Sequence, residues 1–171
     1  GHLAEAAVSF HDATGNDKLL KAACAFADLI CDTFGENKIK GYDGHEICEM
    51  ALFKLYKATG IKKYLDTALF FINERGKKPY YYDTEKGVVS KGDNYHYNQA
   101  HIPPRQQREA VGHAVRGVYL YSAMADLAKE LKDDELKTAC DSIWNNIENK
   151  KMYITGGIGA TVDGEAFSFD Y

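Results

Sequence analysis

Residues 10–26, FHDATGNDKLLKAACAF, and residues 55–71, LYKATGIKKYLDTALFF, align with each other at a constant shift of 45 positions. The shift superposes the two Ala-Thr-Gly triplets, and it also sets Leu20 on Leu65, Ala23 on Ala68 and Phe26 on Phe71. In each copy the glycine ends one pattern of apolar residues at helical spacing, and a second pattern follows it. A repeat of about 45 residues built from two helices is typical of arrays of helical hairpins, which bury their apolar faces by stacking on their neighbours.

Apolar residues at helical spacing predict six helices along the chain. They cover residues 2–14, 17–33, 45–59, 62–75, 106–131 and 133–149. The helices pair into three hairpins, 2–33, 45–75 and 106–149, each an inner helix followed by an outer one. The predicted fold class is therefore all-α. Six such hairpins would close an (α/α)6 toroid, of which about three, a partial barrel, are present within a single domain.

Two predicted loops interrupt this pattern. Residues 77–105 contain many tyrosines among Gly, Asp, Asn and Lys, and residues 151–171 combine four glycines with several large apolar side chains. Long loops on a helical scaffold commonly carry the binding and catalytic groups. The sequence therefore predicts an aromatic loop at 77–105 and a glycine-rich active-site loop at 151–171.

Composition excludes several classes of protein. The 171 residues carry a formal net charge of -4 with acids and bases interspersed, which argues against nucleic-acid binding because that requires a basic face. No apolar run has the length of a membrane span, so we expect no membrane partner. The four cysteines form no Cys-x-x-Cys pair, which excludes a zinc ribbon and favours reduced thiols in a cytoplasmic protein.

The two ends of the sequence also carry an expectation. The chain begins with Gly1-His2 at the start of a helical pattern, and it ends at Tyr171 directly after the glycine-rich loop. We expect a fragment of a longer catalytic domain. Apolar faces at the edges of such a half-toroid would favour association, so a homo-oligomer is also expected.

Glu165 is the acidic residue of greatest interest, because it lies between Gly164 and Ala166 in the glycine-rich loop, with aromatic residues following. Apolar neighbours would desolvate the carboxylate and favour its protonated form, which is the form that a general acid needs. The alternative is an ordinary solvated glutamate in a loop.

Three histidines follow a glycine directly: His2, His45 and His113. Stacking of the hairpins around an axis would bring all three to one end of the ring, where imidazoles can bind sugar hydroxyls. The alternative is three separate capping or core histidines. His101 in the aromatic loop is a further candidate ligand contact. His45 and Glu49 stand four residues apart, so Glu49 could orient the His45 ring or could form a weak surface pair with it.

Six motifs in a fixed order resemble glycoside hydrolase family 127, the β-L-arabinofuranosidases. They are Gly-His-Leu-Ala-Glu-Ala-Ala at 1–7, Gly-Tyr-Asp-Gly-His-Glu at 41–46, Gln-Ala-His-Ile-Pro at 99–103, Ala-Val-Gly-His-Ala-Val-Arg at 110–116, Lys-Met-Tyr-Ile-Thr-Gly-Gly-Ile-Gly at 151–159 and Gly-Glu-Ala-Phe at 164–167. The resemblance covers the whole chain.

The resemblance implies a retaining glycosidase that acts on arabinose-containing oligosaccharides or glycoconjugates. It implies that Glu165 is the general acid/base and that three histidines bind the substrate: His2, His45 and His113. It also implies a zinc-bound cysteine nucleophile whose ligands follow the Gly-Glu-Ala-Phe motif and lie beyond this chain. None of Cys24, Cys31, Cys48 and Cys140 matches those positions. We therefore expect the chain alone to be inactive.

Two other functions fit the same helical pattern. One is a related α/α-toroid hydrolase or lyase that acts on another sugar. The other is a non-catalytic helical-repeat module that binds a protein in its groove, in which case Glu165 and the three histidines would be dispensable.

Overall fold

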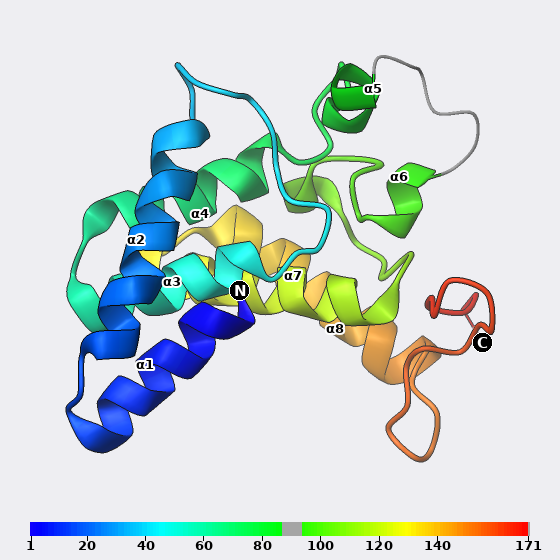
Figure 1. Cartoon of the computed structure of the whole chain (residues 1–171). Coiled ribbons are helices and arrows are strands. Elements are labelled where there is room, and N and C mark those ends of the chain that lie inside the picture. The colour runs from blue at the N-terminus through cyan, green and yellow to red at the C-terminus, as the bar shows by residue number, and fades with distance from the viewer. Residues whose placement is uncertain (87–93, 171) are drawn as a thin grey trace.

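The computed structural model describes residues 1–86 and 94–170, and its framework is a set of helices joined in antiparallel pairs (Figure 1). The long helices are α1 (His2–Thr14), α2 (Lys18–Thr33), α3 (Cys48–Thr59), α4 (Lys62–Glu74), α7 (Ala114–Leu131) and α8 (Asp134–Lys150). Within the described residues the only extended pairings are two isolated bridges, Phe34 with Ile39 and His113 with Ala166. The predicted all-α class is confirmed.

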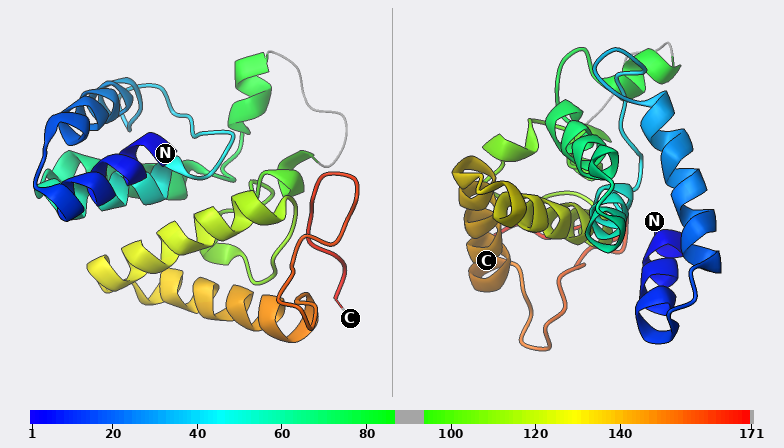
Figure 2. Two further views of the ribbon diagram at one scale, coloured as in Figure 1. Left: turned by 60° about the horizontal axis from the view of Figure 1, so that its bottom comes forward. Right: turned by 90° about the vertical axis from the view of Figure 1, so that its left-hand side faces the viewer.

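The three hairpins stack in sequence order, with α3 packed between α1 and α7 (Figure 2). The second helices lie on the outside, where α2 contacts α4. Because α3 has neighbours on both sides, it buries side chains around most of its circumference, among them Met50, Leu52, Phe53 and Leu55. Helix α1 has a partner helix on fewer sides, and Ala7 is its only fully buried residue. The first helices thus form an inner row and the second helices an outer one.

The Ala-Thr-Gly triplets have a physical function at the turns of the first two hairpins. The Thr14 hydroxyl donates to the Phe10 carbonyl at 2.6 Å, and the Thr59 hydroxyl donates to the Leu55 carbonyl at 2.7 Å. Gly15 and Gly60 then end α1 and α3 in the left-handed conformation, with φ of 70° and 72°. The predicted equivalence is incomplete, because Phe71 is buried whereas 62% of Phe26 is exposed.

Two predicted helix starts differ from the structure. The helix predicted over 45–59 begins at Cys48, because residues 43–47 form a turn bound to the side chain of Arg75. The helix predicted over 106–131 begins at Ala114. Here Gly112 adopts a φ of 71°, and its carbonyl accepts a hydrogen bond from the Phe167 amide at 2.9 Å. This tertiary pairing replaces the helical hydrogen bonds that the apolar pattern predicted.

The segment predicted as an aromatic loop contains short helices, α5 (Tyr81–Lys86), α6 (Asn94–Tyr97) and the 3-10 helix η1 (Pro104–Gln106). Residues 87–93 of that prediction lie outside the described residues. The glycine-rich segment after α8 has no regular structure up to residue 170, as predicted, and it folds back to the start of α7 (Figure 1). The aromatic segment meets the same end of α7, where the His113 amide donates to the Tyr97 carbonyl.

The described helices include none with the length and apolar character needed to span a bilayer. All four cysteines are free thiols, with Cys31 buried and the other three partly buried.

Candidate active site

Three histidines converge at one end of the inner row because α1, α3 and α7 all begin there. His2 is the first residue of α1, His45 lies in the turn before α3, and His113 is the N-cap of α7. The Tyr119 ring lies between His2 and His45, with centroid distances of 5.9 and 5.8 Å. The His45 and His113 rings are 6.5 Å apart. The sequence placed His113 inside a helix, whereas the structure places all three histidines at or just before a helix start.

Glu165 is brought to this histidine cluster by backbone pairing. Its carbonyl accepts a hydrogen bond from the Ala114 amide at 2.9 Å, and the next residue, Ala166, forms a bridge with His113. Its carboxylate Oε2 then lies 3.2 Å from His113 Nε2. The prediction that apolar neighbours desolvate this carboxylate is wrong for the described structure, because 77% of the side chain is exposed. Of the apolar side chains nearby in the sequence, those of Val162 and Phe169 are exposed, whereas Phe167 is buried.

The backbone at Glu165 is strained. Its φ is 46°, and the preceding Gly164 has a φ of 79°. A left-handed conformation is uncommon for a residue with a Cβ, and it persists only where the surrounding contacts enforce it. In this left-handed conformation the Glu165 carboxylate lies next to His113.

The hydrogen bonds of His113 define its tautomer. Its Nδ1 accepts a hydrogen bond from the Arg116 amide at 3.3 Å. A nitrogen that accepts cannot carry the ring proton, so the proton of the neutral imidazole is on Nε2, which faces Glu165. His113 is therefore set to donate to the Glu165 carboxylate.

The surroundings of His45 favour its neutral form. Partial burial lowers the pKa of its imidazole, and the positive charge of the Arg116 guanidinium lowers it further. A neutral imidazole has one donor and one acceptor nitrogen, which suits the hydroxyl groups of a sugar.

A buried ionic cluster lies directly beneath His45. Arg75, at the end of α4, is completely buried, and it donates to Asp43 at 2.8 Å, to Glu46 at 3.0 Å and to Glu49 at 3.2 Å. Burial raises the pKa of Glu46 to about 7 and raises the pKa of Asp43 well above its usual range. Glu49 is likewise fully buried, so the interpretation of Glu49 as a surface partner of His45 is wrong.

A family model of the β-L-arabinofuranosidase GH127 catalytic domain matches residues 1–171. The chain belongs to glycoside hydrolase family 127. The similarity extends over every hairpin and over both loop segments.

A curated relative is the non-reducing end β-L-arabinofuranosidase of Bifidobacterium longum subsp. longum. It is 40% identical over 181 residues, covering 100% of this chain and 28% of the relative. A solved GH127 β-L-arabinofuranosidase from Geobacillus stearothermophilus T6 is 48% identical with a TM-score of 0.95, covering 99% of this chain and 28% of that one. A second solved GH127 β-arabinofuranosidase is 49% identical with a TM-score of 0.86, covering 99% of this chain and 25% of that one.

These matches confirm the predicted fold class, helical hairpins of an α/α toroid. The GH127 chain described here spans less than a third of the length of the relatives that it matches.

His101 stands apart from the other predicted histidines of this GH127 chain. Its ring stacks on His96 at a centroid distance of 4.1 Å, and its carbonyl accepts a hydrogen bond from the Tyr80 hydroxyl. Tyr119 joins the rings of His2 and His45, and His45 joins that of His113, whereas the ring contact described for His101 is with His96. Its role as a substrate contact stays a prediction.

Three residues that the sequence did not single out lie among the histidines: Tyr97, Arg116 and Tyr119. Tyr119 fits the helical apolar pattern of residues 106–131, and Tyr97 is one of several tyrosines in the predicted aromatic loop. Arg116 ends the motif at 110–116, and a cation in an otherwise apolar stretch was the one available signal for it.

Zinc has no evident site in the described part of this chain. Among residues 1–86 and 94–170, no group of three or more His, Cys, Asp or Glu side chains is arranged to hold a metal ion. The three acidic residues beneath His45 surround the Arg75 guanidinium, which occupies the place a cation would take.

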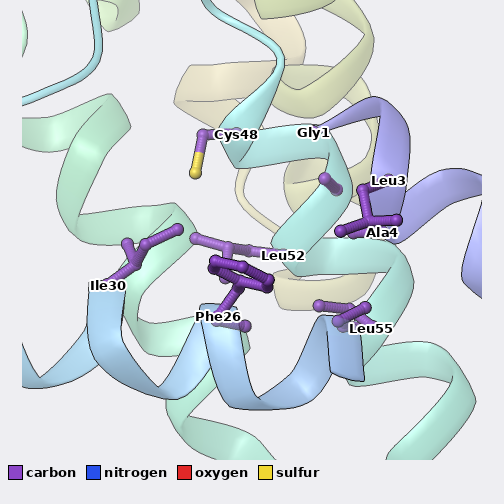
Figure 3. Close-up of a pocket in the computed structure, with 11 residues that line it drawn as sticks. Gly1, Leu3, Ala4, Phe26, Ile30, Cys48, Leu52 and Leu55 are labelled. Carbon is purple, nitrogen blue, oxygen red and sulfur yellow. The ribbon is translucent and has the colours of Figure 1, made fainter. Parts of the chain in front are cut away.

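A separate apolar groove runs between α1, α2 and α3 (Figure 3). Phe26 and Leu52 are among the side chains that line it, and none of the candidate site histidines does. Its volume is about 240 Å³, below the range of about 300–1,000 Å³ that is usual for small-molecule sites. The groove is therefore a poor match for a sugar-binding site.

Proposed function

We propose that this chain is the acid/base-bearing part of a retaining glycosidase that releases L-arabinofuranose from β-L-arabinofuranosides. The observation that carries the proposal is the contact of 3.2 Å between Glu165 Oε2 and His113 Nε2, at the histidine-rich end of the inner helices. The family membership of the chain supports the reaction class.

Glu165 would act in both halves of the reaction. As an acid it donates its proton to the leaving oxygen of the substrate, and as a carboxylate it then removes a proton from the attacking water. Its open position gives a glycosidic oxygen and a water direct access to the carboxyl group. The Nε2–H of His113 stabilises the carboxylate that remains after the first proton transfer.

His2 and His45 would bind the sugar. Both rings lie around Tyr119 at the start of the inner helices, and the neutral His45 can donate to one hydroxyl and accept from another. The ring of Tyr119 adds an apolar surface between them. His101 would contact the part of the substrate that extends over the aromatic insert.

The nucleophile of the retaining reaction would come from outside this chain. We expect a cysteine, held as a thiolate by zinc, from residues beyond position 171. A retaining reaction needs this second group to form a covalent glycosyl-enzyme intermediate. The 171 residues by themselves would therefore hydrolyse nothing.

The test uses the whole protein that contains this segment. It is assayed on aryl furanosides and pyranosides of several sugars, with and without a strong chelator, and as Glu165→Gln. We expect cleavage of the β-L-arabinofuranoside, loss of that activity with chelator, and a decrease of about 10²–10⁴-fold in Glu165→Gln.

Other outcomes would change the proposal in defined ways. Chelator-sensitive cleavage of a different glycoside would keep the mechanism and change the sugar. Full activity in Glu165→Gln would remove Glu165 from the mechanism. Absence of any cleavage, together with absence of bound zinc, would favour a helical-repeat module that binds protein.

A further inference from the structure

We infer that Tyr97 is a positioning residue for the pair Glu165 and His113, and that its aromatic ring rather than its hydroxyl performs this role. The inference rests on the proposed function, because it assumes that Glu165 transfers the proton. Tyr97 is the last residue of α6, within the segment 77–105 that was predicted as an aromatic loop, and it contacts three different parts of the site.

The first contact is with His113. The two rings meet edge to face, with a centroid distance of 5.6 Å and an interplanar angle of 85°. The Tyr97 carbonyl also accepts a hydrogen bond from the His113 amide at 3.1 Å. Tyr97 therefore restricts the positions of both the backbone and the ring of His113, the histidine that faces Glu165.

The second contact is with Gly164, the residue before Glu165. A Cβ atom added to Gly164 would lie 3.1 Å from Cε2 of Tyr97, so the ring packs directly against this glycine. Gly164 and Glu165 are two consecutive residues in the left-handed conformation. Such a conformation is kept only where the surroundings over-determine it, and the Tyr97 ring supplies one side of those surroundings.

The third contact is with Arg116. Its guanidinium lies 5.0 Å from the centre of the Tyr97 ring, and its Nη1 donates to the Asn98 side chain at 2.7 Å. The amide of Arg116 is the group that donates to His113 Nδ1 and so sets the tautomer. Tyr97 thus supports Arg116 as well as His113 and Gly164.

The position of Tyr97 is itself fixed from below. The Asn98 carbonyl accepts a hydrogen bond from Arg75 Nη1 at 3.0 Å. The buried Gln99 side chain donates to the carbonyls of Val111 at 2.7 Å and His113 at 3.1 Å. Because the residues after Tyr97 are anchored to the buried core, its ring is a fixed support for the site.

The test compares Tyr97→Leu, Tyr97→Phe and Glu165→Gln in the whole protein. For each variant, kcat/KM is measured on two aryl β-L-arabinofuranosides, one with an activated dinitrophenyl leaving group and one with an unsubstituted phenyl group. The activated group departs without protonation, so only the phenyl substrate depends strongly on the acid. A general loss of structure would instead lower both rates together.

We expect Tyr97→Leu to lower kcat/KM by about 10²-fold on the phenyl substrate, since a shift of about 1 Å in a reacting group can have an effect of that size. On the dinitrophenyl substrate we expect a decrease of less than about threefold. Tyr97→Phe keeps the ring, so it should recover most of the rate that Tyr97→Leu loses. Tyr56→Leu is the matched control. This half-buried tyrosine lies near the C-terminal end of α3, away from the histidines, and its hydroxyl donates to Glu130.

The outcomes separate this inference from the proposed function. If Glu165→Gln shows the selective loss on the phenyl substrate and Tyr97→Leu does not, the inference fails and the proposed function stands. If Glu165→Gln shows no selective loss, the proposed function fails. An equal loss on both substrates in Tyr97→Leu, or no recovery in Tyr97→Phe, would also overturn the inference.

Gly164→Ala provides the same test without removing the ring. Its added Cβ would press on Tyr97 at a residue with a φ of 79°, so it should shift Glu165 and produce the same selective loss. This variant decides the question if Tyr97→Leu does not fold. If Gly164→Ala and the unchanged protein have the same kcat/KM on each of the two substrates, the inference is contradicted.

Discussion

Carboxylates lie next to a histidine at two places in this molecule, a buried group at one and a single exposed residue at the other. Beneath His45, Glu46 and Glu49 are completely buried and are bound to the equally buried Arg75. Beside His113, the Glu165 side chain is 77% exposed and is positioned by its backbone. The first group is enclosed by side chains from several elements, whereas the second is held at the end of a loop.

The difference shows that a displaced pKa does not by itself identify a catalytic acid. Burial raises the pKa of Glu46 to about 7, a value that would suit a general acid at neutral pH. No substrate can reach Glu46, however, because none of its surface is exposed. Glu165 has the access that proton transfer requires. The buried group therefore supports the turn that carries His45, and the exposed group is the candidate for chemistry.

The largest effect on stability is expected from Arg75→Met. The substitution keeps much of the side-chain volume but leaves three carboxylates without their buried cation. Removal of one partner from a buried ion pair typically costs about 3–5 kcal/mol. The melting temperature and urea midpoint of the whole protein should fall accordingly.

Arg108→Met is the control for this substitution, because Arg108 is exposed and donates to nearby backbone carbonyls. It should change stability by less than about 0.5 kcal/mol. An Arg75→Met protein as stable as the unchanged one would mean that the three acids can share protons without the cation, and the buried group would then not be an ionic support.

The buried group should also make stability depend on pH in a way that the exposed group does not. Burial raises the pKa of Glu46 from 4.5 to about 7, so the folded protein binds more protons than the unfolded chain between these values. Its contribution to stability is therefore present below about pH 4.5 and is lost as the pH rises through about 7. The whole change is about 3 kcal/mol, since each pKa unit corresponds to about 1.4 kcal/mol.

Glu46→Gln removes this dependence. From pH 5 to pH 8 the melting temperature of the unchanged protein should fall steadily relative to that of Glu46→Gln. Glu148→Gln, on the exposed face of α8, is the matched control because it leaves the buried charges as they were. A constant difference for Glu46→Gln over this range would show that Glu46 keeps one protonation state throughout.

Much of the fold could be predicted from the sequence because it depends on local signals. The Ala-Thr-Gly triplets end α1 and α3 through hydrogen bonds between residues four apart, and such signals need no tertiary information. The start of α7 could not be predicted in the same way. Residues 106–113 have a helical apolar pattern, but the pairing of Gly112 with Phe167, far along the chain, overrides it.

The candidate site likewise has features that could be predicted from local sequence and features that could not. The recurrence of Gly-His predicted a set of histidines that the inner helices do bring together. The exposure of Glu165 could not be predicted, because it depends on which distant segments cover the loop and not on its neighbours in sequence. Tyr97 lies in an insert without periodicity, so nothing in the sequence separated it from the other tyrosines.

The Gly-His pairs next to the two acidic groups should respond differently to the same substitution. In Gly112→Ala the new Cβ would collide with the His96 carbonyl oxygen and lie 2.7 Å from the Tyr97 Cα, at a φ of 71°. Strain of this kind costs about 1–3 kcal/mol and should also displace His113, so both melting temperature and turnover should fall. In Gly44→Ala the new Cβ would meet no atom within 4 Å. It should therefore change stability by less than about 0.5 kcal/mol, and equal effects of the two substitutions would contradict the role of the close approach at Gly112.

The smallest expected effect concerns the strain at Glu165 itself, and it compares Glu165→Gly with Glu165→Ala. Both variants lose the carboxylate, so both should lose turnover to the same extent. Alanine keeps the Cβ that makes a φ of 46° unfavourable, whereas glycine adopts this conformation freely but loses more entropy on folding. The two effects oppose each other, and the first is the larger, so Glu165→Gly should be more stable than Glu165→Ala by up to about 1 kcal/mol. The comparison is made by urea unfolding of the two proteins side by side. Greater stability of the alanine variant would mean that the loop relaxes once the carboxylate is removed, and that contact with His113, rather than the backbone, holds Glu165 in its left-handed conformation.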